Sequence, residues 1–389
     1  MPIEAFSPAS LRRALVIKLR HHGDVLLATP VLSMLKRLVP QCEVDALVYA
    51  DTALMLEGHP ALAQLHLIDR NWKRQGMLSQ AAAEWKLMSG LRSRHYDLVV
   101  HLSVHTRGAW MVRLLRPHWS VAPRSREGFW AKSFTHLYPA QSHGDRHTVD
   151  TNLDSLRALG CEPTPADMRV TMVPGPAAES HVAELLARHG LAQGGFVHVH
   201  PASRWTFKCW PADRVAALCD VLAAKGLPIV LTSAPDAKEK ALIDAVCAAR
   251  DAVTCPGLAC REFRFAGRQS GIPGTQSAPA PTIDLSGQLS LKELAALTAQ
   301  AKLFVGVDSA PMHIAAAMGT PVIAIFGPSG DREWGPWGEF GKNRHRVVAS
   351  MTHPCRPCGL AGCNDSKVSD CLTTLPVAQV LAACEELLA

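Results

Sequence analysis

No run of apolar residues in this sequence reaches the roughly 18 positions that a membrane-spanning helix needs. The first apolar stretch, at residues 14–18, is too short for the core of a secretion signal, and no cleavage site follows it. The twelve cysteines in 389 residues are too sparse for a small disulfide scaffold. We therefore expect a cytoplasmic protein.

Several nucleotide-binding signatures are also missing. There is no GxxxxGK[ST] segment, which excludes a P-loop, and no GxGxxG opens the first strand–helix unit, which weakens a dehydrogenase interpretation. The sequence has no DxD pair that would hold a divalent ion, so we expect chemistry that requires neither a catalytic metal nor a cofactor.

The net charge of +6 is unevenly distributed. Residues 1–175 have 21 basic and 15 acidic side chains, whereas residues 176–389 have 19 of each. Apolar residues make up 48% of the chain, which excludes wholesale disorder. The positive half either binds an anionic partner or is an ordinary solvated surface, and charge alone leaves both alternatives open.

Short β-branched runs alternate with segments of helical periodicity along most of the chain. The runs lie at residues 14–18, 44–50, 65–69, 97–103 and 120–123, and again at 196–201, 228–233, 282–287, 303–308 and 321–327. Such alternation indicates parallel sheets covered by helices on both faces. The proline-rich residues 161–180 read as a linker. We expect an α/β protein with two doubly wound domains, 1–175 and 176–375, facing a central cleft, and a final helix within 376–389.

Two local expectations complete the outline. Residues 25–38 have the pattern of one helix following the first strand. Residues 252–281 are rich in Gly, Pro, Ser and Gln, which predicts a long surface loop.

Three segments at strand ends contain residues that suit chemistry. His21-His22-Gly23-Asp24 follows the first strand, and by position Asp24 is either a helix N-cap, the commoner role, or a general base. In residues 305–321 a strand ends before Ser309-Ala310-Pro311, which opens a helix whose N-terminus favours an anion. In residues 200–211, Lys208 is either a phosphate contact or a solvated loop charge.

The combination of these segments resembles glycosyltransferase family 9, the ADP-heptose:lipopolysaccharide heptosyltransferases. The motifs are KLRHHGDVLLATPVL, HPASRWTFKCWP and LFVGVDSAPMHIAAAMGTPVIAIFGPS, in the family's order and spacing. With HTVDTNLDSLRALG at residues 147–160, the first motif is most similar to the heptosyltransferase III-type branch. The resemblance extends over nearly the whole chain.

The resemblance implies a GT-B fold of two Rossmann-like domains, the first binding acceptor and the second binding nucleotide-sugar. It implies an inverting transfer of heptose from ADP-L-glycero-beta-D-manno-heptose to the inner core of lipopolysaccharide, with Asp24 as general base. Glu239 matches a ribose contact and Leu289 an adenine contact. The donor-binding residues it implies are Ser203, Lys208, Glu239, Leu289, Asp308, Ser309, Ala310 and His313.

The acceptor would be the anionic Kdo and heptose region, reached at the cytoplasmic face of the inner membrane, with no nucleic acid involved. Relatives often have small hydroxylated residues before the Gly-Asp pair, where this chain has Arg20, His21 and His22. The acceptor-binding candidates are Arg20, His21, Arg107, Arg124 and Arg126, with Arg70, Lys73, Arg74 and Lys132 as further basic residues.

Two questions stay open from the sequence. Cys355, Cys358, Cys363 and Cys371 suit a structural zinc site, free thiols or disulfides. The alternatives to the proposed transfer are use of another nucleotide-sugar or core position, or a non-catalytic module that binds anions or nucleic acid. The sequence has no basic stripe rich in aromatic residues to support the last alternative.

Overall fold

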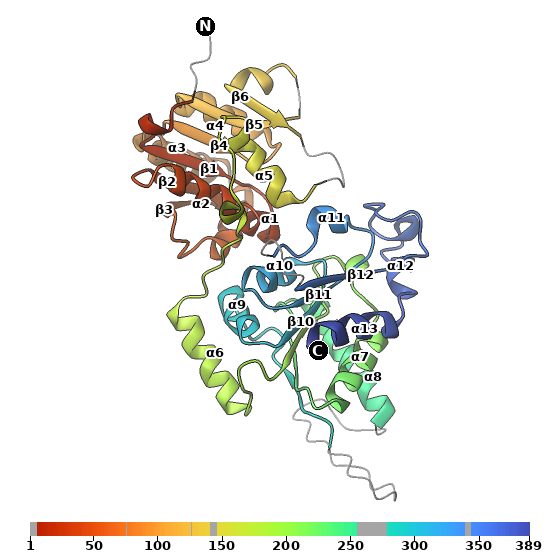
Figure 1. The fold of residues 1–389 in the computed structure, drawn as a ribbon. Coiled ribbons are helices and arrows are strands. Elements are labelled where there is room, and N and C mark those ends of the chain that lie inside the picture. Colours follow the sequence, from red (N-terminus) through yellow and green to blue (C-terminus); the bar gives the residue numbers. More distant parts are fainter. Residues whose placement is uncertain (1–5, 75, 126, 141–145, 255–277, 339–343) are drawn as a thin grey trace, which may run out of the picture. The chain divides into compact units, whose positions relative to one another are not determined.

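The structure is a computed structural model that describes residues 6–74, 76–125, 127–140, 146–254, 278–338 and 344–389. The chain divides into two compact units, Met1–Val173 and Pro174–Ala389 (Figure 1). Among the described residues, no helix is both long and apolar enough to cross a membrane.

The first unit contains a parallel sheet of six strands in the order β3-β2-β1-β4-β5-β6. Its strands are β1 (Arg13–Ile17), β2 (Glu43–Tyr49), β3 (Leu62–Ile68), β4 (Leu98–His101), β5 (Trp119–Arg124) and β6 (His136–Pro139). The chain order reverses between β1 and β4, and ligands of such sheets bind beyond the carboxyl ends of the strands at this switch point.

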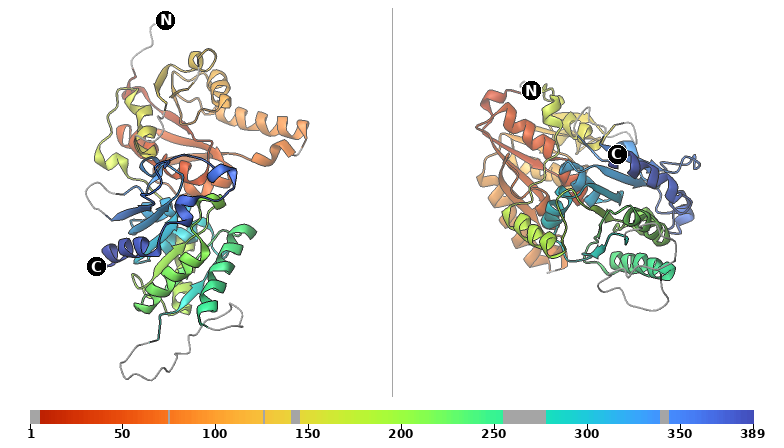
Figure 2. Two further views of the ribbon diagram at one scale, coloured as in Figure 1. Left: turned by 90° about the vertical axis from the view of Figure 1, so that its right-hand side faces the viewer. Right: turned by 60° about the horizontal axis from the view of Figure 1, so that its bottom comes forward.

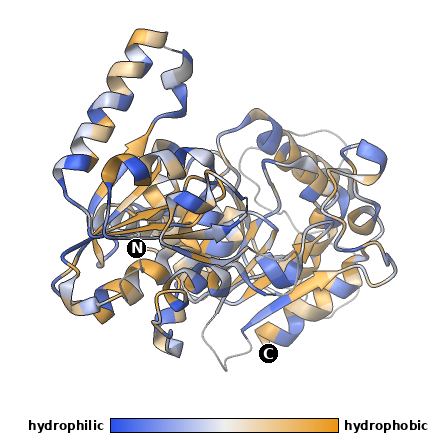
Figure 3. Ribbon diagram, turned by 90° about the horizontal axis from the view of Figure 1, so that it is seen from above, coloured by the Kyte–Doolittle hydropathy of each residue, from blue (hydrophilic) through white to orange (hydrophobic). Residues whose placement is uncertain are grey.

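In the described part of this unit, α-helices and 3-10 helices lie before, between and after these strands. They are η1 (Pro8–Ser10), α1 (His22–Leu26), α2 (Thr29–Leu38), η2 (Ala50–Met55), η3 (Arg70–Arg74), α3 (Met77–Ser93), α4 (Thr106–Leu115), η4 (Ala131–Ser133), α5 (Thr148–Arg157) and η5 (Pro165–Met168). The central strands are apolar along their length because helices cover both faces, and Figure 3 shows them in the colour of hydrophobic residues.

The second unit repeats this topology with the strand order β12-β11-β10-β7-β8-β9. Its strands are β7 (Val197–His200), β8 (Ile229–Leu231), β9 (Thr282–Asp284), β10 (Leu303–Val307), β11 (Val322–Phe326) and β12 (His345–Ala349). The switch point of this sheet lies between β7 and β10. The expected α/β class and the two doubly wound sheets are confirmed.

The helices of the second unit follow the same alternation. They are α6 (Pro176–Arg188), η6 (Thr206–Lys208), α7 (Ala212–Ala224), α8 (Ala237–Thr254), α9 (Leu291–Ala299), α10 (Ala310–Ala317), α11 (Asp331–Trp334), η7 (Cys363–Asp365), α12 (Asp370–Thr373) and α13 (Val377–Leu388). The final helix, α13, packs on α7 within this unit.

The single helix expected at residues 25–38 is wrong, because the structure has α1 and α2 there. Pro30 lacks an N–H and its ring would clash with the carbonyl of Leu26 if one helix continued. The hydroxyl of Thr29 donates to that carbonyl at 2.8 Å instead. This break turns α2 away from α1 at the residues that follow Asp24.

Other local expectations need correction. The segment 161–180 is not all linker, because α6 begins at Pro176, and proline suits the first turn of a helix. Helix α8 continues to Thr254, beyond the start of the loop expected at 252–281. Most of that loop, residues 255–277, lies outside the described residues.

Candidate active site

The donor-binding residues expected in the second unit all follow the carboxyl ends of four neighbouring strands. Ser203 and Lys208 follow β7, Glu239 follows β8, Leu289 follows β9, and the remaining four follow β10 as Asp308, Ser309, Ala310 and His313. Because these strands are parallel and adjacent, their carboxyl ends lie at one edge of the sheet. The fold therefore places the predicted residues along one edge of the sheet, with those after β7 and β10 at the switch point.

An ion pair joins the two sides of this switch point. Lys208 lies on η6 and Asp308 comes directly after β10, and their Nζ and Oδ2 atoms are 2.5 Å apart. The Asp308 side chain is 7% exposed and that of Lys208 is 22% exposed. The ammonium thus remains accessible to a second anion while it neutralises a buried carboxylate.

Helix α10 begins beside this pair. Ser309 is its N-cap residue, yet the hydroxyl makes no capping hydrogen bond. That hydroxyl is buried and has no hydrogen-bond partner among the described residues. The positive end of the helix dipole favours a phosphate group here, although Pro311 has no N–H and the Met312 N–H donates to the Ser309 carbonyl at 3.1 Å. His313 is buried one turn into α10.

Strands β10 and β7 pack closely together just before the residues of the Lys208–Asp308 pair. A Cβ atom at Gly306 would lie 2.9 Å from the carbonyl oxygen of His200 and nearer still to the ring of Phe304. Only glycine fits at this position. The Ser203 hydroxyl, also buried, accepts a hydrogen bond from the Trp205 N–H at 3.3 Å.

Glu239 and His200 are a second pair of polar residues at the carboxyl edge of the second sheet, which is called the donor edge below. Burial raises the pKa of Glu239, and the carboxylate accepts a hydrogen bond from the Ala234 N–H at 2.9 Å. Burial lowers the pKa of His200 to about 3, so this ring is neutral at physiological pH, 4.0 Å from the Glu239 carboxylate. Leu289 is partly buried and packs on the core beneath this edge.

Asp24 is the third residue of α1 in the first unit, and the N-cap residue of this helix is His21. The N-cap role considered for Asp24 is therefore wrong. Its carboxylate is half-buried and makes no hydrogen bond or ion pair with any described residue. A carboxylate placed after the central strand and not engaged in structure is available to a substrate hydroxyl.

Lys18, which the sequence analysis overlooked, supplies a buried cation near Asp24. Its ammonium donates to the carbonyl of Leu102 and to Oδ1 of Asn152, both at 3.1 Å. Burial lowers the pKa of Lys18, and the charge of Asp24 opposes that shift. Asn152 in turn donates to the carbonyl of Leu27 at 3.0 Å, which ties α5 to the end of α1.

A pocket of about 420 Å³ opens at the carboxyl ends of β1 to β4. Its lining residues are Leu19, Arg20, His21, Tyr49, Ile68, Asp69, Arg70, Trp72, Gln80, Glu84, His105 and Arg107. Three of the basic candidates, Arg20, His21 and Arg107, therefore meet at one site, together with Arg70.

Two of these arginines are held in place. The Arg70 guanidinium lies 4.0 Å from the centre of the Tyr49 ring and donates to the carbonyl of Arg20 at 3.1 Å. Arg107 forms an ion pair with Glu84 of α3. No described residue pairs with the exposed guanidinium of Arg20. The pocket thus combines aromatic faces with a cation that is not engaged.

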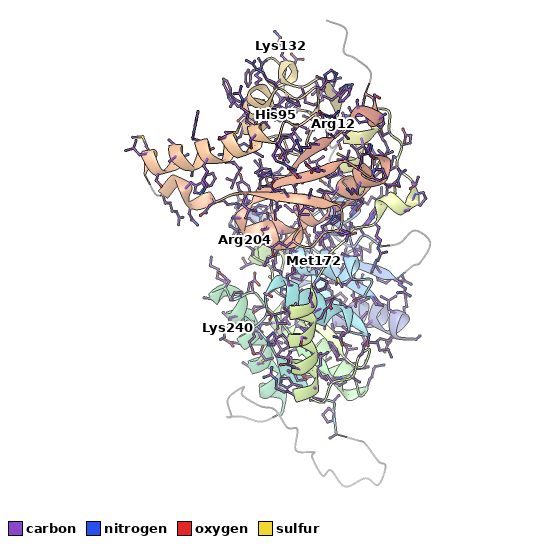
Figure 4. The ribbon with its side chains drawn as sticks, turned by 90° about the vertical axis from the view of Figure 1, so that its left-hand side faces the viewer. Arg12, His95, Lys132, Met172, Arg204 and Lys240 are labelled. Carbon is purple, nitrogen blue, oxygen red and sulfur yellow. The ribbon has the colours of Figure 1, made fainter. Side chains whose placement is uncertain are left out.

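The other basic candidates lie elsewhere or are not described. Arg124 is exposed at the end of β5 and Arg74 is exposed on η3, and neither lines the pocket. Lys132 lies on η4, apart from α3 (Figure 4). Arg126 and the side chain of Lys73 lie outside the described residues.

The four clustered cysteines are free thiols in this structure. Cys355 and Cys358 are exposed, Cys363 is intermediate and Cys371 is buried. Nowhere in the described ranges do three or more His, Cys, Asp or Glu side chains converge in a way that would hold a metal ion. His353 beside them bonds through Nδ1 to the Ser350 hydroxyl at 2.7 Å.

The sequence profile of glycosyltransferase family 9 (heptosyltransferase) matches residues 84–262 and 272–368. The chain belongs to glycosyltransferase family 9. It is 32% identical over 377 residues to lipopolysaccharide heptosyltransferase 3 of Escherichia coli, which covers 95% of this chain and 97% of the relative. The family membership expected from the three motifs is confirmed, and this glycosyltransferase family 9 chain is an enzyme.

Solved structures agree on the fold. The glycosyl transferase family 9 protein from Veillonella parvula DSM 2008 is similar with a TM-score of 0.73 at 21% identity, covering 97% of both chains. E. coli heptosyltransferase WaaC with ADP-2-deoxy-2-fluoro heptose is similar with a TM-score of 0.66 at 19% identity, covering 96% of this chain and 99% of that one. These similarities confirm the GT-B fold expected for the family 9 chain.

Proposed function

We propose that this protein transfers heptose from ADP-L-glycero-beta-D-manno-heptose to the inner core of lipopolysaccharide, with inversion at the anomeric carbon and Asp24 as general base. The observation that carries the proposal is the 32% identity to a lipopolysaccharide heptosyltransferase along 97% of that relative's length. The residues at the two switch points supply the groups that this reaction needs.

The donor site is the carboxyl edge of the second sheet. Lys208 and the N-terminus of α10 suit a diphosphate, because a cation and the positive end of a helix dipole lie at the same edge of the sheet. Stabilising the negative charge that develops on the departing ADP is a large contribution to catalysis in such sites. Asp308 and the Ser309 hydroxyl suit the hydroxyl groups of the sugar, and Glu239 suits those of the ribose.

The base is Asp24. In an inverting transfer, the carboxylate takes the proton of the acceptor hydroxyl as the hydroxyl oxygen attacks the anomeric carbon, and ADP leaves from the opposite face. Lys18 lies near this carboxylate as a buried cation, and Asn152 positions its ammonium.

The acceptor site is the pocket of the first unit. Its arginines suit the carboxylates and phosphates of the inner core, while Tyr49 and Trp72 offer apolar faces for sugar rings. The proposal places this acceptor at the cytoplasmic face of the inner membrane. No metal or other cofactor enters the reaction, which relies on Lys208 and the α10 N-terminus to stabilise the leaving group.

A direct transfer assay tests the proposal. The purified protein is incubated with ADP-heptose and a lipid-free inner-core oligosaccharide, and the product is analysed by mass spectrometry for the addition of one heptose. Nuclear magnetic resonance then gives the anomeric configuration. ADP-glucose and UDP-glucose are the control donors. A folded protein that binds ADP yet transfers no heptose to any inner-core acceptor would overturn the proposal, and transfer from a control donor would reassign the sugar.

A further inference from the structure

Helix α3 is apolar on two faces. Its inner face contributes Leu91, which is fully buried, and Leu87 and Met88, which pack on the core of the first unit. Its outer face, which comprises Leu78, Ala82, Trp85, Lys86 and Arg92, is exposed. Met77 lies on the inner stripe, but at the N-terminal end of the helix, where it is exposed as well. Figure 2 shows α3, in orange, extending away from the rest of its unit.

The apolar side chains of the outer face and of the N-terminal end of α3 are open to solvent. Met77 and Leu78 are each 89% exposed and Trp85 is 77% exposed. Large apolar side chains grouped on one exposed face mark contact with another protein or with a membrane. The group is compact, since residues 78, 82 and 85 follow one another at helical spacing.

The charges on the outer face are of one sign. Lys86 and Arg92 are basic, and the acidic residue of the helix, Glu84, points inward and pairs with Arg107. Arg74 on η3 adds another exposed cation just before the helix. Apolar and aromatic side chains bordered by lysine and arginine, without acidic neighbours, are typical of helices that lie on anionic lipid surfaces.

The inner face of the same helix forms part of the acceptor pocket. Gln80 and Glu84 line that pocket, and Trp72, from the η3 segment that leads into α3, lines it as well. The pocket and the outer face therefore lie on opposite sides of one helix. A sugar acceptor that extends from its lipid by more than the width of one helix, about 10 Å, would reach the pocket when α3 rests on the membrane.

We propose that the outer face of α3 and its exposed N-terminal end dock the enzyme on an anionic phospholipid bilayer, with Met77, Leu78 and Trp85 entering the interface and Lys86 and Arg92 contacting the headgroups. This inference rests on the proposed function, because it assigns α3 to the delivery of a lipid-linked acceptor. Charge complementarity favours the bilayer over a second copy of the chain, since two identical basic faces repel each other.

The test compares vesicle binding by the full chain and three variants. Met77→Glu places an acidic group at the N-terminal end of α3 and Trp85→Glu places one on the outer face; Met351→Glu is the matched control, because Met351 is 88% exposed in the second unit. Flotation with vesicles of phosphatidylethanolamine and phosphatidylglycerol should show wild-type binding that weakens in phosphatidylcholine alone. Each α3 variant should bind about tenfold less than wild type, and the control should bind normally.

Activity separates this inference from the proposed function. The α3 variants should retain wild-type turnover on a lipid-free oligosaccharide and lose it on the same acceptor embedded in vesicles. Equal vesicle binding by wild type and Met77→Glu would overturn the inference. So would a wild-type dimer that Met77→Glu dissociates in sedimentation velocity, with no vesicle binding by either protein. Absence of heptose transfer by the wild type on lipid-free acceptor would instead refute the proposed function, while the vesicle result would still decide the role of α3.

Discussion

Replacing Lys208 with alanine should weaken ADP binding by about 10- to 100-fold. A unit charge about 4 Å from the diphosphate is worth about 4 kcal/mol at an effective dielectric constant of about 20. Lys208 is 22% exposed and already pairs with Asp308, so water and that carboxylate reduce its effect. A hydrogen bond to a charged group contributes about 1.5–3 kcal/mol, and a loss of that size weakens binding by one to two orders of magnitude.

The ion pair with Asp308 allows a second test, because Lys208→Ala also leaves the buried carboxylate of Asp308 without its cation. Asp308, with a side chain 7% exposed, would then repel the diphosphate directly. The double variant Lys208→Ala/Asp308→Asn should therefore bind ADP about tenfold more tightly than Lys208→Ala alone. This gain is expected even though Asp308 itself is expected to contact the donor. The two substitutions should be strongly non-additive, as expected for residues in contact.

Isothermal titration calorimetry with ADP on wild type, both single variants and the double variant measures this coupling. Lys302→Ala is the matched control, because Lys302 is exposed at the amino end of β10, the end of the strand opposite Asp308. Thermal melting checks that each variant is folded. Unchanged ADP affinity in folded Lys208→Ala, or additive effects in the double variant, would refute the assignment of this pair to the diphosphate site.

Three further outcomes are expected. Activity should survive chelation of divalent ions, because the sequence lacks an acidic pair to hold one, and loss in EDTA that only Mg²⁺ restores would contradict this. The KM for the acceptor should rise more steeply with ionic strength than the KM for ADP-heptose. Arg20→Glu should make the acceptor KM less dependent on ionic strength, whereas Arg124→Glu, which lies outside the pocket, should not. Equal slopes for both substrates would show that the basic half does not steer the acceptor. The free energy of unfolding should fall as the pH drops from about 6.5 toward 3, because burial lowers the pKa of His101 and of His200 to about 3 and the unfolded chain binds those protons first. The slope should reach about 1.4 kcal/mol per pH unit for each histidine, and denaturant unfolding that shows constant stability between pH 7 and pH 5 would count against it.

The sequence predicts the interior strands and two of the four edge strands, β3 and β9. The other two edge strands, β6 and β12, were not predicted. An edge strand is covered less completely, so its apolar run is broken by residues such as His136 and Arg346. Helix α6 was hidden for a related reason, since its proline at the first position looks like a linker signal unless the buried Val182 and Leu185 are also considered.

The position of residues such as Ser203 and Asp308 at one edge of the second sheet was predictable, because they follow strand ends, whereas Glu239 and Leu289 were named only from the family resemblance. Parallel strands gather such residues at one edge, so residues such as Ser203 and Asp308, which are far apart in the chain, come together. The surroundings of Asp24 could not be predicted from the sequence. Lys18 reads as the end of an apolar run, and its partner Asn152 lies 134 residues away, so only the folded chain shows that a buried cation sits near the proposed base.

The residues of the acceptor pocket could not be grouped from the sequence either. Its residues come from loops and helices after four different strands, and no local pattern distinguishes Arg20 and Arg70 from Arg124. The sequence correctly concentrates positive charge in the first unit, but only packing decides which cations share a site.

The role of Asp24 is tested most directly by the turnover of Asp24→Asn with saturating ADP-heptose and lipid-free acceptor. The substitution keeps the shape of the side chain and removes its ability to accept a proton. We predict that kcat falls by about two to four orders of magnitude, the usual contribution of a general base, while ADP affinity and melting temperature remain those of the wild type. A variant that transfers heptose at a near-normal rate, or that loses activity only through lower stability, would contradict the central claim that Asp24 is the base of this transferase.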